Sequence, residues 1–322
     1  MADIHWQPAA SPALLQARAD LNKTLRAFFE ARGVLEVETP LLSHAIGTDP
    51  NLHPVIASYQ AHPRAQAEAL YLQTSPEFAM KRLLAAGSGP IYQLCKAVRN
   101  GELGAKHNPE FTMLEWYRPG FTLAQLMDEV EALAVAALGN LSCKRITYRE
   151  LFQQHLGIDP HAASIDALDA LTRKHVDLHQ QETHRDTLLE LLYSQVIEPA
   201  LQQATFIHDY PATQAALARI TPDAQGVPVA QRFELVIGGM EIANGYDELS
   251  DASEQVRRFA ADQALRLQRG QPEFPTDGRF LAALAHGLPD CAGVALGVDR
   301  LLMLQTQART IAEVLSFPHD RA

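Results

Sequence analysis

The sequence predicts an α+β fold in which an antiparallel β-sheet is flanked by helices. Two stretches with alternating side chains, residues 91–99 and 111–118, are separated only by a loop, as in a hairpin. Strand patterns return within residues 232–251 and 293–306, after a helix-rich stretch. Because directly connected strands pair antiparallel, whereas a doubly wound sheet alternates strands with helices, this order favours the antiparallel arrangement.

The N-terminal part is expected to begin with a helix over residues 12–32 that ends at Gly33. A short strand at 34–40 stops at Pro40, and 43–68 is expected to be irregular loop or short strands. Residues 75–87 open with Ser-Pro and end with glycine, which predicts a short helix. The apolar side of the first helix consists of Leu14, Leu21, Leu25, Phe28 and Phe29.

Helices dominate the expected structure after the hairpin. Thr122 and Gln125 resemble a capping box for a helix through about Leu138, and residues 142–230 are helix-rich and polar. Residues 232–251 predict a strand, a turn and the start of a helix, and 293–306 a glycine-spaced strand running into a helix. The apolar stripe expected on the helix after residue 251 consists of Val256, Phe259, Ala260, Ala264 and Leu267.

Composition excludes several classes of protein. No run of about 18 apolar residues exists, and the N-terminus lacks the order of a signal peptide, so we expect a cytoplasmic protein without a membrane segment. The net charge of −11 argues against a broad nucleic-acid surface. The three cysteines lie far apart without metal-type clustering, which predicts free thiols and no structural zinc.

The strand at 111–118 places Glu115 and Tyr117 on one face and Trp116 and Arg118 on the other. A carboxylate beside a phenol indicates a pocket. An edge strand with one wet face explains the pattern equally well. The segment alone leaves both interpretations open.

Four charged residues are candidates for nucleotide chemistry: Arg99, Glu241, Glu248 and Arg300. Each alone fits a surface ion pair. Together, two arginines and two carboxylates on strands of one sheet could bind a nucleoside triphosphate, because arginines fork onto phosphates and carboxylates hold Mg²⁺ against them. The chain has neither a P-loop GxxxxGK[ST] nor a GxGxxG after a strand.

Several separated segments resemble the class II aminoacyl-tRNA synthetases. Residues 32–42, "RGVLEVETPLL", are similar to motif 1, 98–117, "VRNGELGAKHNPEFTMLEWY", to motif 2, and "GVALGVDRLLML" to motif 3. Residues 232–251 and "TIAEVLSFP" resemble the lysyl branch of that class. The chain starts almost at the helix before motif 1, so we expect one catalytic domain over 1–322, with a helix-rich insertion at about 142–230 and no N-terminal OB-fold. With "TSPEFAMKRLL", this pattern resembles the elongation factor P lysyltransferases, the EpmA/PoxA/GenX family.

The resemblance implies roles for individual residues. Arg99 and Arg300 should contact ATP phosphates, with Glu241 as a third catalytic residue and Glu241 and Glu248 as Mg²⁺ ligands. Further ATP contacts are implied for Asn100, Gly101, Glu102, Asn108, Ile242 and Gly297. The amino-acid contacts implied are Ser75, Pro76, Glu77, Glu115, Tyr117, Asn244, Glu248 and Ala295.

Two positions depart from the synthetase pattern. Gly101 stands where motif 2 usually has glutamate and Glu102 follows, so either Glu102 serves or the Gly101 backbone takes over part of the adenine contact. Ala295 replaces the glycine of ordinary lysyl enzymes, and one methyl in such a pocket changes discrimination by about 1–3 kcal/mol.

The function implied is activation of (R)-β-lysine or lysine as an adenylate and its transfer to the ε-amino group of one lysine of elongation factor P. The resemblance also implies a homodimer through residues 33–40, with Lys106 and His107 as candidates to touch the protein partner, and tRNA is not expected. The alternatives are an enzyme that charges RNA and a non-catalytic regulatory paralogue. All four charged candidates are present, which counts against the paralogue.

Overall fold

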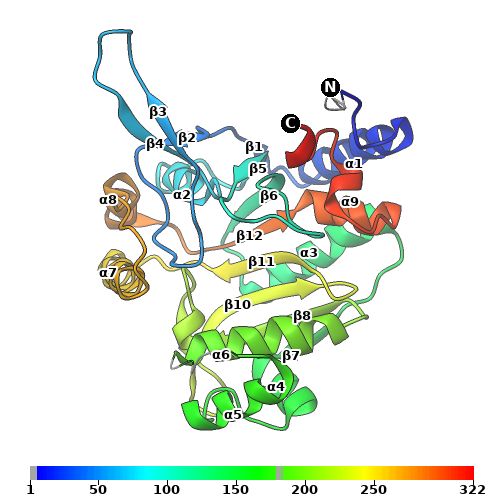
Figure 1. Ribbon diagram of the computed structural model, residues 1–322, viewed down its shortest axis with the longest axis vertical. Helices are drawn as coiled ribbons and strands as arrows, with labels where there is room; N and C mark the ends of the chain where they lie inside the picture. Colours follow the sequence, from blue (N-terminus) through cyan, green and yellow to red (C-terminus); the bar gives the residue numbers. More distant parts are fainter. Residues whose placement is uncertain (1–5, 179–181, 183) are drawn as a thin grey trace.

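The computed structural model describes residues 6–178, 182 and 184–322 (Figure 1). The strands are β1 (Leu35–Glu36), β2 (Leu42–Ser43), β3 (Ile56–Tyr59), β4 (Glu68–Leu72), β5 (Ile91–Val98), β6 (Glu110–Pro119), β7 (Lys144–Thr147), β8 (Thr205–Pro211), β9 (Ile220–Pro222), β10 (Pro228–Val236), β11 (Glu241–Asp247) and β12 (Cys291–Gly297). The α-helices are α1 (Pro12–Glu30), α2 (Glu77–Ala85), α3 (Leu123–Leu138), α4 (Tyr148–Leu156), α5 (Ile165–His175), α6 (Arg185–Leu192), α7 (Ala252–Gln268), α8 (Gly278–Gly287), α9 (Val298–Thr306) and α10 (Ile311–Val314).

The main sheet runs in the order β1-β5-β6-β12-β11-β10-β8-β7, and β9 pairs with β10. All pairs from β5 through β10 to β8 are antiparallel, whereas β1–β5 and β7–β8 at the two edges are parallel. The predicted antiparallel α+β fold is therefore confirmed. A separate three-stranded sheet is formed by β2, β4 and β3, and Figure 1 shows its β3–β4 hairpin reaching away from the main sheet.

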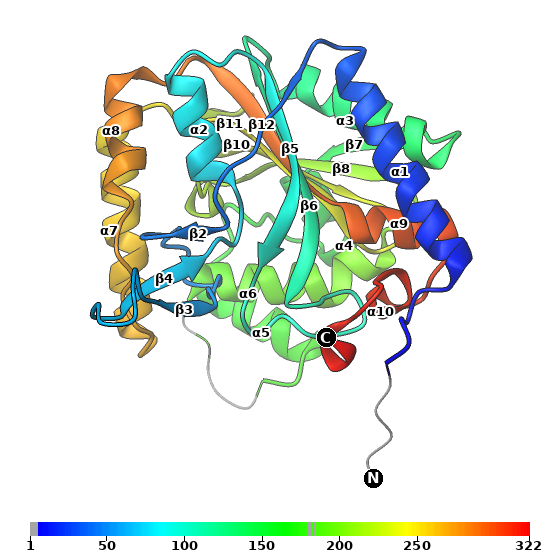
Figure 2. The ribbon, with the colours of Figure 1, turned by 90° about the horizontal axis from the view of Figure 1, so that it is seen from above.

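Helices cover both faces of the sheet. Figure 2 shows α1, α3 and α9 on one side, where they share the largest apolar core with the sheet, including Phe29, Leu126 and Leu301. The helices α2, α7 and α8 lie on the other side around a smaller cluster that includes Met80 and Phe280. A third cluster joins α4, α5 and α6 to β8 and β10. The polar face of the sheet between these two smaller clusters is where the candidate site lies.

Several local predictions are confirmed. The helix α1 begins after the N-cap Ser11, buries the predicted Leu21, Leu25, Phe28 and Phe29, and is followed by Gly33 at φ +65°. The capping box of Thr122 with Gln125 is present at the start of α3. Capping geometry depends on neighbours in sequence, which is why these features follow from the sequence alone.

The segment 232–251 was predicted to contain one strand, and this was wrong. It contains most of β10 and all of β11, which form a hairpin around Gly238 and Gly239, both at positive φ. A side chain at 239 would also lie 3.1 Å from the Pro199 carbonyl oxygen, so glycine is needed there. Two residues of the predicted stripe on α7, Val256 and Leu267, are 50% and 56% exposed, because only the Phe259 side of α7 packs against the other helices.

The strand predicted over 34–40 is confined to β1 at the sheet edge. Within 142–230 the structure has α4, α5 and α6, but β7, β8 and β9 also join the main sheet from this segment. The cysteines Cys95, Cys143 and Cys291 are free. Among the described helices, none combines the length and the apolar character that a membrane crossing requires.

Candidate active site

Two rows of side chains cross the open face of the main sheet. Strand register aligns five positions in the first row, Gln93, Glu115, Ala295, Asn244 and Glu234. The second row consists of Ile91, Tyr117, Gly293, Tyr246 and Arg232. Directly opposed residues of antiparallel strands share a face, so four of the eight predicted amino-acid contacts, Glu115, Tyr117, Asn244 and Ala295, lie together on this face.

Of the two interpretations of the strand at 111–118, the structure excludes the edge strand with one wet face, because β6 lies between β5 and β12. Glu115 and Tyr117 are each 2% exposed, so their face of β6 is not a wet face. Ser75 Oγ donates to Glu115 Oε2 at 2.9 Å, and the Tyr117 hydroxyl donates to Glu115 Oε1 at 2.6 Å. On the opposite face Trp116 is buried in the core and its Nε1 donates to Glu129 Oε2 at 3.1 Å.

The start of α2 supplies the next contacts. Ser75 Oγ accepts from the Glu77 backbone N–H at 3.0 Å, and Pro76 is the residue before the first helical turn. Lys81, one turn after Glu77, is 1% exposed, and its Nζ lies 2.6 Å from both Glu77 Oε1 and Glu248 Oε2. Sequence analysis missed Lys81, although its i,i+4 spacing from Glu77 is a visible signal.

We call Glu77, Glu115, Glu248 and Lys81 the carboxylate cluster. Burial raises the pKa of Glu115 to about 7 and that of Glu248 to about 8, and the charge of Glu77 adds to both shifts while Lys81 opposes them. Burial by itself lowers the pKa of Lys81, but Glu248 and Glu77 outweigh it and raise the value. If all four groups are ionised, three carboxylates and one ammonium give the cluster a net charge of −2.

Close packing around the cluster depends on Gly293 of β12. A Cβ at this position would lie 2.4 Å from Glu248 Oε1 and 2.4 Å from Tyr117 Cδ1. Glycine therefore lets both side chains approach the strand. Two residues further along β12, Ala295 is half-buried. It lies between Glu115 and Asn244 in the first row, so its methyl group is on the same face of the sheet as their side chains.

Arg232, also missed from the sequence, orients Asn244. The Arg232 Nε donates to Asn244 Oδ1 at 3.1 Å, and its other nitrogens bond Glu234 and the Gln214 carbonyl. Since Oδ1 of Asn244 accepts this hydrogen bond, the Nδ2 amide group is the end that can donate to a ligand. Polar Arg232 and Glu234 at alternate positions of an apolar strand were the available signal.

The predicted phosphate contacts gather around His107. Arg300, in the first turn of α9, donates from Nη1 to the Glu241 carbonyl at 2.9 Å, and its Nη2 lies 2.6 Å from His107 Nε2. Burial lowers the pKa of His107, and the charge of Arg300 lowers it further. Of the smaller effects, Glu102 and Glu241 raise this pKa and Arg99 lowers it. Arg300 therefore links His107 to Glu241, whose Oε2 lies 3.6 Å from Arg300 Nη1.

Arg99 connects this group to the amino-acid side. Its Nε donates to the Thr74 carbonyl at 3.2 Å, next to Ser75, and its Nη1 lies 3.7 Å from Glu102 Oε1. Gly101 has φ +85°, so the loop turns there and presents Glu102 beside Arg99. Asn100 is exposed on the same turn.

Other predicted ATP contacts have their side chains elsewhere. Asn108 Nδ2 donates to the Glu110 carbonyl at 2.6 Å and its Oδ1 accepts from the His319 N–H at 3.0 Å, so both ends of the amide bond the chain itself. Ile242 is 2% exposed in the large core. Gly297 directly precedes α9. Lys106 Nζ donates to the Gly239 carbonyl at 2.6 Å.

The structure does not bring Glu241 and Glu248 together. They lie at opposite ends of β11, and seven residues of strand span about 23 Å. Glu198 lies beside Glu241, because its Oε1 accepts a hydrogen bond from the Glu241 backbone N–H at 3.1 Å. Burial raises the pKa of Glu198, and the charge of Glu241 adds to the shift. Sequence analysis gave no indication of Glu198.

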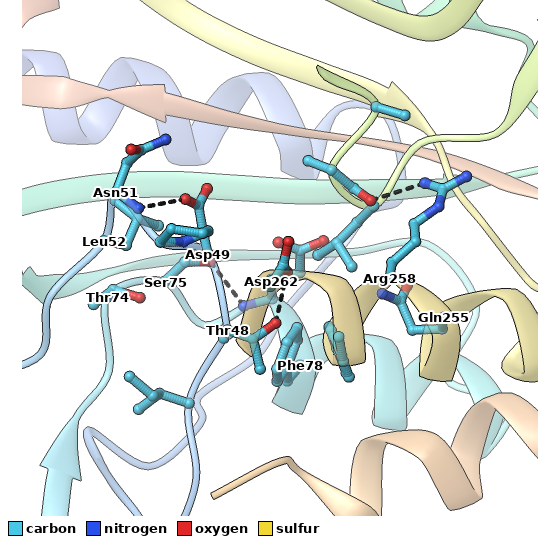
Figure 3. A pocket seen from close by; sticks show the side chains of 18 of the residues that line it. Thr48, Asp49, Asn51, Leu52, Thr74, Ser75, Phe78, Gln255, Arg258 and Asp262 are labelled. Carbon is cyan, nitrogen blue, oxygen red and sulfur yellow. Dashed lines mark hydrogen bonds between the residues drawn. The ribbon is translucent and has the colours of Figure 1, made fainter. Parts of the chain in front are cut away.

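A cavity of about 1090 Å³ opens above the cluster (Figure 3). Ser75, Glu77, Arg232 and Tyr246 line its inner end. Glu115, Tyr117 and Glu248 form a buried layer behind them, since each is at most 2% exposed. The site therefore has a polar recess backed by excess negative charge, and Arg99 and Arg300 nearby are suited to phosphates.

Comparison with known proteins agrees with this geometry. The family of tRNA synthetases class II (D, K and N) matches residues 4–321. A protein of Pseudoalteromonas translucida named "Elongation factor P--(R)-beta-lysine ligase" is 51% identical over 321 residues, covering 98% of each chain. Proteins of the same name from Salmonella paratyphi B and Salmonella schwarzengrund are 48% identical over 322 residues, again covering 98% of each chain. The chain therefore belongs to the class II tRNA synthetase family.

Proposed function

We propose that this chain activates (R)-β-lysine, or lysine, with ATP and transfers it to the ε-amino group of a specific lysine of elongation factor P. The names of the similar ligases support both the amino acid and the acceptor. The observation on this chain that carries the proposal is the carboxylate cluster, with three buried carboxylates and one ammonium. A buried charge excess of this kind requires a cationic ligand or protonation.

The charge balance favours a diamino acid. Once its carboxylate is joined to AMP, lysine or β-lysine carries two ammonium groups, and these with Lys81 equal the three carboxylates. An ammonium group at the inner end of the cavity contacts Glu77 and neutralises the layer behind it. We assign the amino-acid contacts to Ser75, Pro76, Glu77, Glu115, Tyr117, Asn244, Glu248 and Ala295.

ATP, as the second substrate, fits the position around His107. Arg99 and Arg300 are partly exposed, and their nearest carboxylate oxygens lie 3.7 Å and 3.6 Å away, so both guanidinium groups keep donors for phosphates. Arg300 lies in the first turn of a nine-residue helix, where free backbone N–H groups also favour phosphate. We assign the remaining ATP contacts to Asn100, Gly101, Glu102 and Glu241, and to the main chain of Asn108, Ile242 and Gly297, since the side chains of Asn108 and Ile242 are engaged elsewhere.

The donor set around Glu241 fits Mg²⁺. No group of three or more potential ligands gathers in the described part of the chain, but Mg²⁺ is held by one or two carboxylates together with substrate phosphates. Glu241 and the adjacent Glu198 would hold the ion, while Glu248 is paired with Lys81. When bound, the ion supplies neutralisation of phosphate charge.

The reaction proposed has two steps. The amino-acid carboxylate oxygen bonds the α-phosphorus of ATP and the bond to pyrophosphate breaks, with Arg99 and Arg300 holding the phosphates in line. The acceptor amine, having lost one proton, then bonds the acyl carbon. The bond between this carbon and the phosphate oxygen breaks, AMP leaves, and the nitrogen releases a second proton. The product is an amide.

Three further assignments rest on the same proposal. The chain works as a single catalytic domain with an insertion at about 142–230 and functions in the cytoplasm. It forms a homodimer through residues 33–40, which is supported by the position of β1 at the sheet edge and by Leu35, whose side chain is 57% exposed. The acceptor is a protein, and tRNA is not a substrate.

Two assays test the proposed function. Amino-acid-dependent exchange of pyrophosphate into ATP tests activation without any acceptor, and we expect it with β-lysine and lysine. Labelled amino acid is then offered with ATP to elongation factor P or to bulk tRNA. We expect label on the protein that survives mild alkali, since an amide does and an aminoacyl ester does not. Alkali-labile label on tRNA alone would contradict the proposal.

A further inference from the structure

The cavity above the cluster extends well beyond the amino-acid recess. Figure 3 shows part of its wall, which is built from the loop at 43–52, from α2 and from α7. Residues of α6 and of the 212–217 segment complete the wall. Arg99, Glu241 and Arg300 are absent from its lining among the described residues. The cavity therefore leads from the amino-acid recess away from the phosphate position.

Its volume exceeds what a single amino acid fills. Sites that enclose drug-sized ligands measure about 300–1,000 Å³, and this cavity of about 1090 Å³ is slightly larger than that range. Lysine occupies only the inner end beside Glu77. The outer part is free for a second, larger group.

The outer part is acidic. Asp49, Asp186, Glu190 and Asp262 line it, and within the described chain none of them lies within salt-bridge distance of a cationic side chain. Burial raises the pKa of Asp262 to about 6, and the charge of Asp49 adds to the shift. Glu190 is exposed at the rim, and Asp262 is half-buried.

The arginines of the lining do not cancel this charge. Arg258 bonds Glu254 and the carbonyls of Ala216 and Ala218, and Arg269 donates to Asn51 Oδ1. Arg82 and Arg279 are exposed residues of α2 and α8. The side formed by the 48–52 loop, α6 and α7 thus keeps a net negative charge.

A second observation points to a ligand with peptide groups. Gln255 of α7 lines the cavity and is 1% exposed, yet neither its Oε1 nor its Nε2 has a hydrogen-bond partner among the described residues (Figure 3). A buried amide without partners is unfavourable unless a ligand supplies them. One donor and one acceptor side by side match a peptide unit. Phe78 and Phe259, with ring centroids 5.8 Å apart, offer apolar surface for an aliphatic side chain.

We infer that this outer cavity receives the lysine-bearing segment of the acceptor protein. Its acidic side attracts the cationic lysine and its neighbours, Gln255 bonds the main chain, and the acceptor amine is led to the acyl group at the inner end. The inference rests on the proposed function. It assigns the partner to this cavity, and not to the motif 2 loop, where Lys106 and His107 are bonded to Gly239 and Arg300.

Separate measurement of the two half-reactions tests the inference. We expect Asp262→Asn, Glu190→Gln and their combination to leave pyrophosphate exchange within twofold of the unaltered protein. For the pair, kcat/KM of transfer to elongation factor P should fall about tenfold, with a weaker dependence on salt. Asp20→Asn on α1 removes the same charge on the other side of the sheet and should change neither step. Glu190 is exposed, so Glu190→Gln remains informative even if the pair folds poorly.

Gln255→Leu separates a ligand contact from a structural role. We expect transfer to fall several-fold while the midpoint of thermal unfolding does not drop, because the amide has no partner to lose. A lower midpoint would overturn the role of Gln255. Exchange and transfer reduced equally in Asp262→Asn and Glu190→Gln, or transfer unchanged in both, would overturn the acceptor cavity. Failure of the unaltered protein to modify elongation factor P would refute the proposed function instead.

Discussion

Binding of the diamino acid should release protons from the carboxylate cluster. At pH 7 a carboxyl group with a pKa of about 7 is about half protonated, and one with a pKa of about 8 about nine-tenths protonated. Glu115 and Glu248 together then hold about 1.4 protons in the empty site. Two ammonium groups lower both pKa values, so about 1.4 protons leave on binding, and affinity should rise about 25-fold per pH unit near pH 7.

Titration calorimetry with lysine or β-lysine measures this number directly. The observed enthalpy is plotted against the ionisation enthalpy of several buffers at pH 7, and the slope gives the protons exchanged. We expect release of about 1.4 protons for the unaltered protein and at most about 0.5 for Glu248→Gln, in which only Glu115 titrates. Asp20→Asn, far from the cluster, should behave as the unaltered protein does.

The empty protein should show the matching change in stability. Because both folded-state pKa values lie above the ordinary carboxyl value of 4.5, the two groups stabilise the fold below about pH 4.5, and this contribution is lost as the pH rises through about 7 and 8. Bound diamino acid should therefore raise the stability of the folded protein most at high pH. Three calorimetric results would refute the charge-balance reasoning: uptake of protons on binding, no release of protons, or the same number of protons released by Glu248→Gln as by the unaltered protein.

Three further substitutions test separate parts of the site. Arg300→Ala should reduce pyrophosphate exchange at least 100-fold while circular dichroism is unchanged, since it removes a charge-assisted phosphate contact worth about 3 kcal/mol or more; activity within a few-fold of normal would contradict this role. Ala295→Gly should widen the amino-acid pocket and raise kcat/KM for lysine relative to β-lysine by about tenfold, and an unchanged ratio would place selectivity elsewhere. Gly293→Ala should lower the free energy of unfolding in urea by about 1–3 kcal/mol, because the new methyl overlaps Glu248 and Tyr117; a neutral result would mean that the cluster can shift aside.

Much of the fold was accessible from the sequence. The β5–β6 hairpin, the capping box at Thr122 and the strand that leads into α9 follow from local periodicity and neighbouring side chains. The segment at 232–251 was misjudged because β11 carries a mixed pattern, and its strand character comes from pairing with β10 and β12.

For the site, the sequence by itself determined that Glu115 and Tyr117 share a face, because side chains alternate along any strand. It also determined that Arg300 lies where a strand runs into a helix. Only the tertiary structure decided that Lys81 lies beside Glu248, that Arg232 orients Asn244, and that Glu241 lies beside Glu198 and far from Glu248. Those partners come from different elements, some more than 100 residues apart. Their meeting depends on sheet register and helix docking, which local spacing does not encode.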